Sequence, residues 1–218
     1  MIRKTSQWLA CASCVIAINS VAHAQEAIAE RFGPTALSRI GALVVSVGDV
    51  TGDGIADFLA SRRVGASNLP TVEVLSGATL DVVATYPGIG QFWNWTTVAP
   101  GGSGAGPAGD LNGDGRNEVL MVVTPAGATL AVIEAVDPIL ATTVATFEGE
   151  IEVDGFFWPG GERFGDRFGS GGDVNGDGVP DVVVGSSMIP TWGIYEMSGL
   201  ARVYSGADGS TLHTIFLA

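Results

Sequence analysis

The stretch Gly172-Asp173-Val174-Asn175-Gly176-Asp177-Gly178-Val179-Pro180-Asp181 places oxygen-bearing side chains at alternate positions of a glycine-rich segment. Two earlier ten-residue stretches repeat this pattern. Their leading aspartates, Asp49 and Asp110, and that of the third copy, Asp173, are 61 and 63 residues apart. A repeat of this length is typical of an array of similar structural units. The fold is therefore expected to consist of one structural unit and its copies.

A short apolar run follows each acidic stretch: Phe58-Leu59-Ala60, then 119–123, then 182–184. Runs this short, rich in branched side chains and bounded by turns, indicate buried β-strands. Further strands are predicted at 71–77, 82–85, 129–133, 143–147, 201–206 and 211–215. Each unit then holds about four strands with the acidic loop between the first two, as in a blade of a β-propeller. The sequence predicts an all-β fold, a partial β-propeller of about three four-stranded blades; residues 27–37 alone show a weak helical pattern.

The predicted organisation begins with an export signal. Arg3 and Lys4 precede an apolar stretch, and Ala22-His23-Ala24 supplies the small-x-small pattern that precedes cleavage. The predicted segments are a signal peptide at 1–24, an N-terminal segment at 25–38, and repeats at 39–88, 89–149 and 150–218. We therefore expect a secreted or periplasmic protein with no membrane anchor after cleavage behind Ala24.

The acidic stretches predict calcium binding. Calcium takes six to eight oxygen ligands from carboxylates, amides and backbone carbonyls. Counting each leading aspartate as position 1, positions 1, 3, 5 and 9 carry side-chain oxygens, position 7 offers its carbonyl, and the glycine at position 6 permits a sharp bend. Three crowded carboxylates repel one another without a cation, so metal is expected to stabilise the fold. The predicted ligands of up to three Ca²⁺ ions are Asp49, Thr51, Asp53, Ile55, Asp57, Asp110, Asn112, Asp114, Arg116, Glu118, Asp173, Asn175, Asp177, Val179 and Asp181.

Two other interpretations of these stretches are an EF-hand, which fails on both of its requirements, and simple hairpin turns. An EF-hand needs a bidentate Glu at position 12 and flanking helices, but position 12 is Ala60, Met121 or Val184 and the flanks are predicted strands. Asn-Gly and Asp-Gly pairs also form hairpin turns without any metal. Three copies that each complete positions 1, 3, 5, 6 and 9 favour the metal site.

The third copy resembles the FG-GAP repeat of integrin α subunits and many secreted bacterial proteins. It has Phe164-Gly165, then the acidic loop, then Val184-Gly185-Ser186 where the family has Gly-Ala-Pro. The first copy keeps Ile40-Gly41 but reads Ser61-Arg62-Arg63 at the Gly-Ala-Pro element, and the second keeps little beyond the loop and its strand. The resemblance implies a β-propeller with calcium loops between the first two strands of a blade, and a role in extracellular recognition or adhesion.

Composition and charge narrow the function classes. The formal charge of −13 becomes −15 once Arg3 and Lys4 leave with the signal, which disfavours nucleic acid as a partner. The segment after residue 24 has no Cys or Lys, and its single histidine, His213, alternates within a predicted strand. The acidic run of Glu148, Glu150, Glu152 and Asp154 resembles a solvated loop more than a glycosidase carboxylate pair. The protein is therefore not expected to be an enzyme.

The predicted partner is an extracellular protein or glycan. Two aromatic clusters, Phe92-Trp93-Asn94-Trp95 and Phe156-Phe157-Trp158, lie between the repeats. Their rings either fill the space between blades or stack on sugars, which would make the chain a carbohydrate-binding or accessory propeller of a polysaccharide-degrading system. Three blades are fewer than a closed propeller generally needs. Possible completions are a longer chain, an open array, or self-association of copies to close the ring.

Overall fold

The computed structural model describes residues 14–15, 30–31, 39–63, 70–87, 104–123, 132–149, 152–153, 156–157, 164–190 and 197–217. The regular structure in these ranges is entirely β-strand, which confirms the predicted all-β class. No helix in the described ranges is long and apolar enough to cross a membrane. The predicted signal peptide lies outside them except for Cys14 and Val15.

Three antiparallel sheets of four strands carry the fold, and we call them blades 1, 2 and 3. Within each blade, strands adjacent in sequence are hydrogen-bonded neighbours. Blade 1 consists of β3 (Arg39–Gly48), β4 (Asp57–Arg63), β5 (Pro70–Leu75) and β6 (Val82–Pro87). Blade 2 consists of β7 (Ala105–Gly109), β8 (Glu118–Val123), β9 (Val132–Asp137) and β10 (Thr142–Glu148). Blade 3 consists of β13 (Phe164–Gly172), β14 (Asp181–Pro190), β15 (Met197–Tyr204) and β16 (Thr211–Leu217). Two short pairs join β1 (Cys14–Val15) to β2 (Glu30–Arg31) and β11 (Glu152–Val153) to β12 (Phe156–Phe157).

Two local predictions differ from this structure. The third strand of blade 2 was predicted at 129–133; residues 129–131 lie outside the described ranges, and β9 continues past 133 to Asp137, pairing with β8 from Val132 opposite Val123 to Val136 opposite Val119. The amino-acid composition of the segment does not determine which of its residues pair with β8. The weak helical pattern at 27–37 is also wrong at Glu30 and Arg31, which pair with Cys14 and Val15 as a strand.

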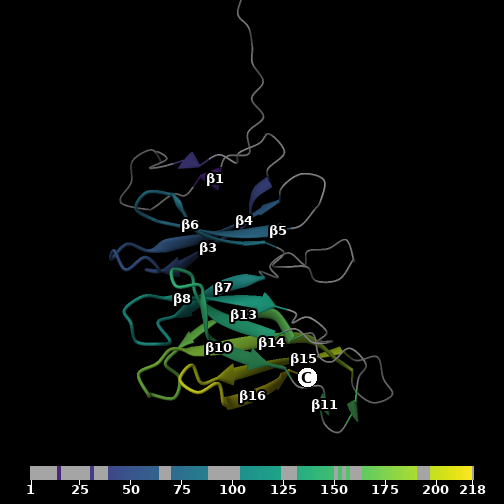
Figure 1. Cartoon of the computed structure of the whole chain (residues 1–218). Coiled ribbons are helices and arrows are strands. Elements are labelled where there is room, and N and C mark those ends of the chain that lie inside the picture. The colour runs from purple at the N-terminus through teal and green to yellow at the C-terminus, as the bar shows by residue number, and fades with distance from the viewer. Residues whose placement is uncertain are drawn as a thin grey trace, which may run out of the picture.

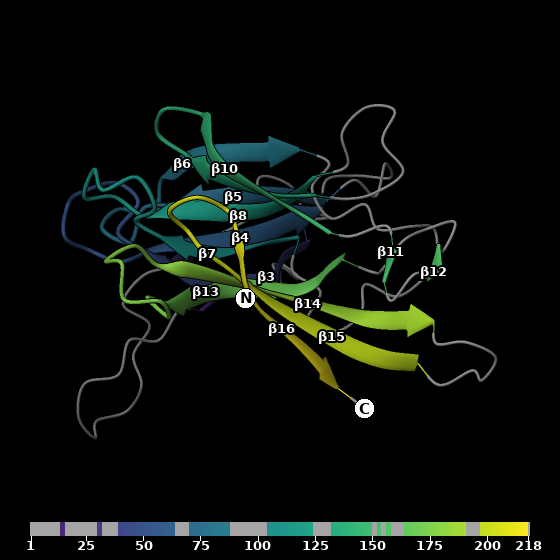
Figure 2. The ribbon, with the colours of Figure 1, turned by 90° about the horizontal axis from the view of Figure 1, so that it is seen from below.

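The blades stack face to face in chain order, with blade 2 in the middle (Figures 1 and 2). Successive side chains of a strand point to opposite faces of the sheet, so β8 packs against both blade 1 and blade 3. Val119 and Met121 belong to the core shared with blade 1, whereas Leu120 and Val122 belong to the core shared with blade 3. This stack of successive four-stranded antiparallel sheets is the arrangement of a partial β-propeller.

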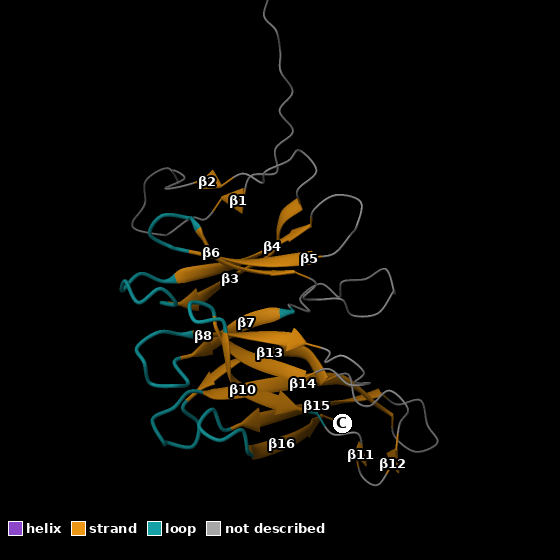
Figure 3. Cartoon of the chain, in the orientation of Figure 1, coloured by secondary structure: helices purple, strands orange, loops and turns teal. Residues whose placement is uncertain are grey.

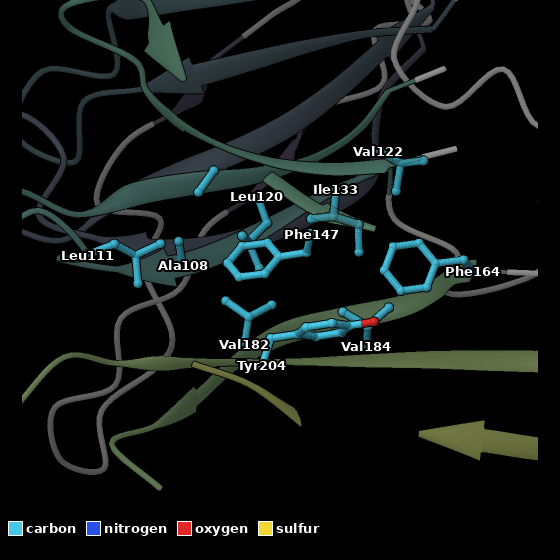
Figure 4. Packing of buried hydrophobic residues seen from close by; sticks show 11 residues of the cluster. Ala108, Leu111, Leu120, Val122, Ile133, Phe147, Phe164, Val182, Val184 and Tyr204 are labelled. Atoms are coloured by element: carbon cyan, nitrogen blue, oxygen red, sulfur yellow. The ribbon is translucent and has the colours of Figure 1, made fainter. Parts of the chain in front are cut away.

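The core between blades 2 and 3 is the more aromatic one (Figure 4). The Tyr204 ring lies 5.6 Å from the Phe147 ring and 6.1 Å from the Phe164 ring, the latter edge-on. The Tyr204 hydroxyl donates a hydrogen bond of 2.9 Å to the Glu148 carbonyl. Each aromatic pair contributes about 0.5–1.5 kcal/mol beyond its buried area. The contacts of Tyr204 with Phe147 and Glu148 join blade 3 to blade 2, whereas its contact with Phe164 lies within blade 3.

Candidate metal-binding loops

The three acidic stretches form the loops between the first and second strand of each blade: loop one (49–57) joins β3 to β4, loop two (110–118) joins β7 to β8, and loop three (173–181) joins β13 to β14. The described turns gather along one side of the stack, at the left in Figure 3. In each loop the glycines at positions 4 and 6 have positive φ; in loop three these are Gly176 at 79° and Gly178 at 91°. A side chain with Cβ is strained in that conformation, so these glycines permit the turn.

The aspartate at position 1 organises the backbone of its loop. In loop one, Asp49 Oδ1 accepts hydrogen bonds from the N–H groups of Gly52 (2.6 Å) and Asp53 (3.1 Å), and Oδ2 accepts one from Gly54 (2.7 Å). Asp110 and Asp173 accept the equivalent three bonds in loops two and three. The tight curl therefore depends on this carboxylate, which the sequence predicted as a calcium ligand.

Positions 3 and 5 continue the pattern, with one exception. The carboxylate at position 5 accepts the N–H of position 7 in every loop, as Asp177 does from Val179 at 2.8 Å. Asn112 and Asn175, at position 3, accept the N–H of position 5. Thr51 takes that place in loop one, and its buried Oγ1 has no hydrogen-bond partner among the described residues. An unpaired buried hydroxyl is costly, and a bound cation would satisfy its oxygen.

The carboxylate at position 9 anchors loops one and three to the blade. Asp57 is fully buried; its Oδ2 accepts the N–H groups of Val50 and Thr51, both at 2.8 Å, and its Oδ1 accepts that of Gly77 at 2.8 Å. Asp181 is equally buried. Its carboxylate accepts hydrogen bonds from the backbone N–H groups of Val174, Asn175 and Gly206. Gly77 and Gly206 start the turns between the third and fourth strands. In loops one and three, the residue at position 9 therefore joins the loop to a turn twenty or more residues further along the chain.

Loop two lacks that tie for a chemical reason. The strand register aligns Val136 of blade 2 with Leu75 and Tyr204 of its neighbours, so Pro138 occupies the place of Gly77 and Gly206. Proline has no N–H to donate. Position 9 is here the longer Glu118, whose Oε2 accepts the Leu111 N–H at 2.6 Å and whose Oε1 accepts from Asn112 Nδ2 at 2.9 Å. Glu118 therefore turns toward its own loop.

The consequence is a carboxylate cluster in loop two. Oxygen atoms of Asp110, Asp114 and Glu118 all lie within 4.8 Å of one another, the one such group of three found among the described residues. Burial raises the pKa of the Glu118 carboxyl; the charges of Asp110, Asp114 and Asp137 raise it further, while the Leu111 N–H opposes the rise. A divalent cation at this point would offset the repulsion among these groups. In loops one and three the carboxylates at positions 1, 5 and 9 do not converge in this way, because position 9 is held by the neighbouring turn.

Arg116 was predicted to offer only its backbone carbonyl to a cation. Its side chain, however, forms two ion pairs beside loop two. Its Nη2 lies 2.8 Å from Asp114 Oδ2 and 3.1 Å from Oδ2 of Asp137, which is 2% exposed. The hydrogen bonds from Arg116 lower the pKa of Asp114. Asp137 stands where blades 1 and 3 have Ser76 and Ser205, and it also accepts the N–H groups of Ile139 and Leu140. The break in the Ser-Gly turn pattern at Asp137-Pro138 is the sequence signal that could have exposed this pair.

The remaining candidate residues lie apart from the loops or outside the described ranges. His213 is exposed on β16, and Glu148 is exposed at the end of β10. Glu152 lies in β11 and Phe156 and Phe157 in β12, whereas the other residues of the acidic run and of both aromatic clusters are outside the described ranges.

The fold and loops define a partial β-propeller with an acidic loop at the same place in every blade. Comparison with protein families identifies the third unit: residues 164–188 match the FG-GAP repeat. This confirms the resemblance drawn from Phe164-Gly165 and loop three. No curated protein matches the sequence.

Among solved structures, the chain is similar to the exotype rhamnogalacturonan lyase YesX, with a TM-score of 0.52 and 15% sequence identity. The matched region covers 82% of this chain and 33% of the lyase chain. The chain thus spans about a third of the length of that protein. At this identity the likeness concerns the fold, and it supports the propeller architecture.

Proposed function

We propose that this chain is a secreted, calcium-stabilised FG-GAP propeller protein that binds an extracellular protein or glycan and performs no catalysis itself. The observation that carries the calcium assignment is the shared construction of the three loops. In each loop an aspartate at position 1 accepts three backbone N–H groups and the carboxylate at position 5 accepts the N–H of position 7, which curls the oxygen-bearing residues into one tight turn. Oxygen-only donor sets of this kind suit calcium.

Each of the three loops offers a different set of oxygen ligands to calcium. Loop two offers three converging carboxylates, and loop one offers the buried, unpaired Thr51 Oγ1. In loop three, Asp177 Oδ2 is occupied by Asn175 Nδ2 at 2.8 Å, an interaction that rotation of the amide would exchange for an oxygen ligand. Bound calcium would supply positive charge that holds each loop against its own repulsion, and the loops would in turn stiffen the first hairpin of each blade.

Thermal unfolding of the full chain with calcium and with a chelator tests the metal assignment. A site filled at 100 times its dissociation constant adds about 2.7 kcal/mol to folding stability. We expect calcium to raise Tm by several degrees, chelator to remove the gain, and magnesium to replace calcium poorly because it demands stricter octahedral geometry. Identical Tm values with calcium and chelator would contradict the proposal.

Paired variants locate the effect in loop three. Asp173→Ala combined with Asp177→Ala should remove that loop's share of the calcium-dependent gain. The matched control, Asp81→Ala combined with Asp208→Ala, removes two exposed carboxylates from the outer turns of blades 1 and 3 and should keep the full gain. Equal losses in the two double variants would mean that general charge reduction, and not a site, explains the response.

The choice between protein and glycan ligands needs a separate test. A glycan array that includes rhamnogalacturonan fragments probes the alternative of an accessory propeller in polysaccharide degradation. Binding that disappears in Trp93→Ala and Trp158→Ala variants would favour that alternative. Binding that persists without those rings, or retention of protein ligands only, would favour protein recognition.

A further inference from the structure

Loops one and two touch each other through a polar contact. Asn117, at position 8 of loop two, donates its backbone N–H to the carbonyl of Asp49 at 2.8 Å. Its side-chain Nδ2 donates to the carbonyl of Val47 at 3.1 Å. The two bonds hold the backbone on both sides of Gly48, directly before and at position 1 of loop one. The aspartate that organises loop one is therefore held in place by a residue of the next blade.

Close packing accompanies these two hydrogen bonds. Gly48 has a φ of 75°, and a Cβ built there would clash with the Asn117 side chain. At position 4 of loop one, a Cβ on Gly52 would lie 3.3 Å from Cγ of Arg116. The guanidinium of that arginine pairs with two carboxylates of blade 2. Positions 7 and 8 of loop two therefore both lie against loop one, where glycines leave room for the approach.

The contact between loops two and three has a different chemistry. Position 8 of loop three is Pro180, which has no N–H to donate to the carbonyl of Asp110. Its ring packs on Gly109, where a Cβ would lie 2.8 Å from Cγ of the proline. A Cβ on Gly113, the counterpart of Gly52, would meet nothing within 4 Å. Loop three therefore packs on loop two through an apolar ring that offers neither of the donors of Asn117.

The polar contact gives the two loops a way to influence each other. Asn117 directly precedes Glu118, which belongs to the carboxylate cluster of loop two. Cation binding in loop two would hold the segment that carries Asn117, and with it both donors to the backbone of loop one. Loop one would then lose less conformational freedom on binding its own cation, because its position 1 residue is already in place. By linkage the effect is reciprocal.

We propose that Asn117 is a positioning residue that couples calcium binding in loops one and two, so that these loops fill cooperatively while loop three fills independently. The inference rests on the proposed function of the loops as calcium sites. One intramolecular hydrogen bond changes an equilibrium constant by roughly twofold to tenfold, so a coupling of about threefold to tenfold is expected. Repulsion between the bound cations acts in the opposite direction, but salt screens it at exposed turns.

Isothermal titration of calcium into the full chain at about 0.15 M salt measures the coupling. Three variants of the chain retain loop one alone, loop two alone, or both. The other loops are disabled by asparagine at positions 1 and 5, which removes charge and keeps side-chain size. The overall constant for two ions should exceed the product of the two single-loop constants by a ratio of about three to ten. A ratio of about one or less would overturn the proposal.

Two substitutions at Asn117 locate the coupling. Asn117→Pro removes both donors and copies the residue of loop three, so the ratio should fall to about one. Asn117→Ala removes only the side-chain donor and should give an intermediate ratio. A general loss of affinity or stability in either variant enters the single-loop constants as well and cancels in the ratio. A ratio that neither substitution lowers would overturn the role of Asn117.

Loops two and three provide the matched control. In a chain with loop one disabled, the same ratio should lie within about twofold of one, as for independent sites. A ratio as large as that of loops one and two would mean that packing between blades transmits the effect without Asn117. Single-loop binding with a ratio of about one throughout would overturn the coupling alone. No binding in any single-loop chain would overturn the proposed calcium sites as well.

Discussion

Blades 2 and 3 are built on the same four-stranded frame and differ in what covers them and in how their loops are tied. Blade 2 is buried on both faces, and its loop turns Glu118 inward because Pro138 offers no N–H. Blade 3 is covered on one described face, and its loop is tied by Asp181 to Gly206. One repeat motif therefore supports both a carboxylate cluster and a backbone anchor, depending on a turn outside the motif.

The largest expected difference concerns the two faces. Phe147→Ala should lower the free energy of unfolding by about 3–5 kcal/mol, since it empties a core site. Ile215→Ala, at the equivalent place in blade 3, should cost less than about 1 kcal/mol, because Ile215 is 49% exposed whereas Phe147 is 1% exposed. Urea unfolding of the two variants measures both costs. Similar costs would mean that Ile215 is covered in solution.

The next effect concerns the turn that anchors loop three. In Gly206→Ala, the new Cβ would clash with the Pro180 carbonyl oxygen and lie 2.8 Å from Leu111 Cδ2. We expect a loss of about 1–3 kcal/mol, the usual range for overpacking. Gly169→Ala, where a Cβ would meet nothing within 4 Å, is the control and should change stability by less than about 0.5 kcal/mol. Pro138→Gly in blade 2 should cost no more than about 1 kcal/mol. If all three variants unfold at the same urea concentration, the difference between the two anchors has no energetic consequence.

The smallest effect concerns Arg116, which competes with a cation for Asp114. The Arg116–Asp114 pair is open to solvent and therefore weak, so Arg116→Gln should raise the calcium affinity of loop two by no more than about fivefold. Isothermal titration of a chain with loops one and three disabled at Asp49, Asp53, Asp173 and Asp177 isolates that site. A chain with loop three alone intact serves for the matched change Val179→Gln, which alters position 7 without removing charge and should leave affinity unchanged. A fall in affinity on replacing Arg116 would show that the guanidinium supports the site instead.

Much of the candidate site could be predicted from sequence because its main contacts are local. The position 1 aspartate bonds to N–H groups three to five residues ahead, so spacing alone identifies it. The role of position 9 could not be predicted that way. Asp57 bonds to Gly77, and that contact exists only because β4 pairs with β5 in one register. The Arg116 pair with Asp137 was missed for the same reason.

The sequence by itself determined the repeat, the strand content and the acidic loops, since strand alternation and turn chemistry act over a few neighbouring residues. It also predicted that the strands after the acidic loops are buried, without showing on which faces. Only the tertiary structure decided which of those faces are covered, because burial depends on the blade that packs opposite. Tertiary structure likewise decided that loop two gathers three carboxylates while its neighbours do not, because the deciding N–H group belongs to a turn on another pair of strands.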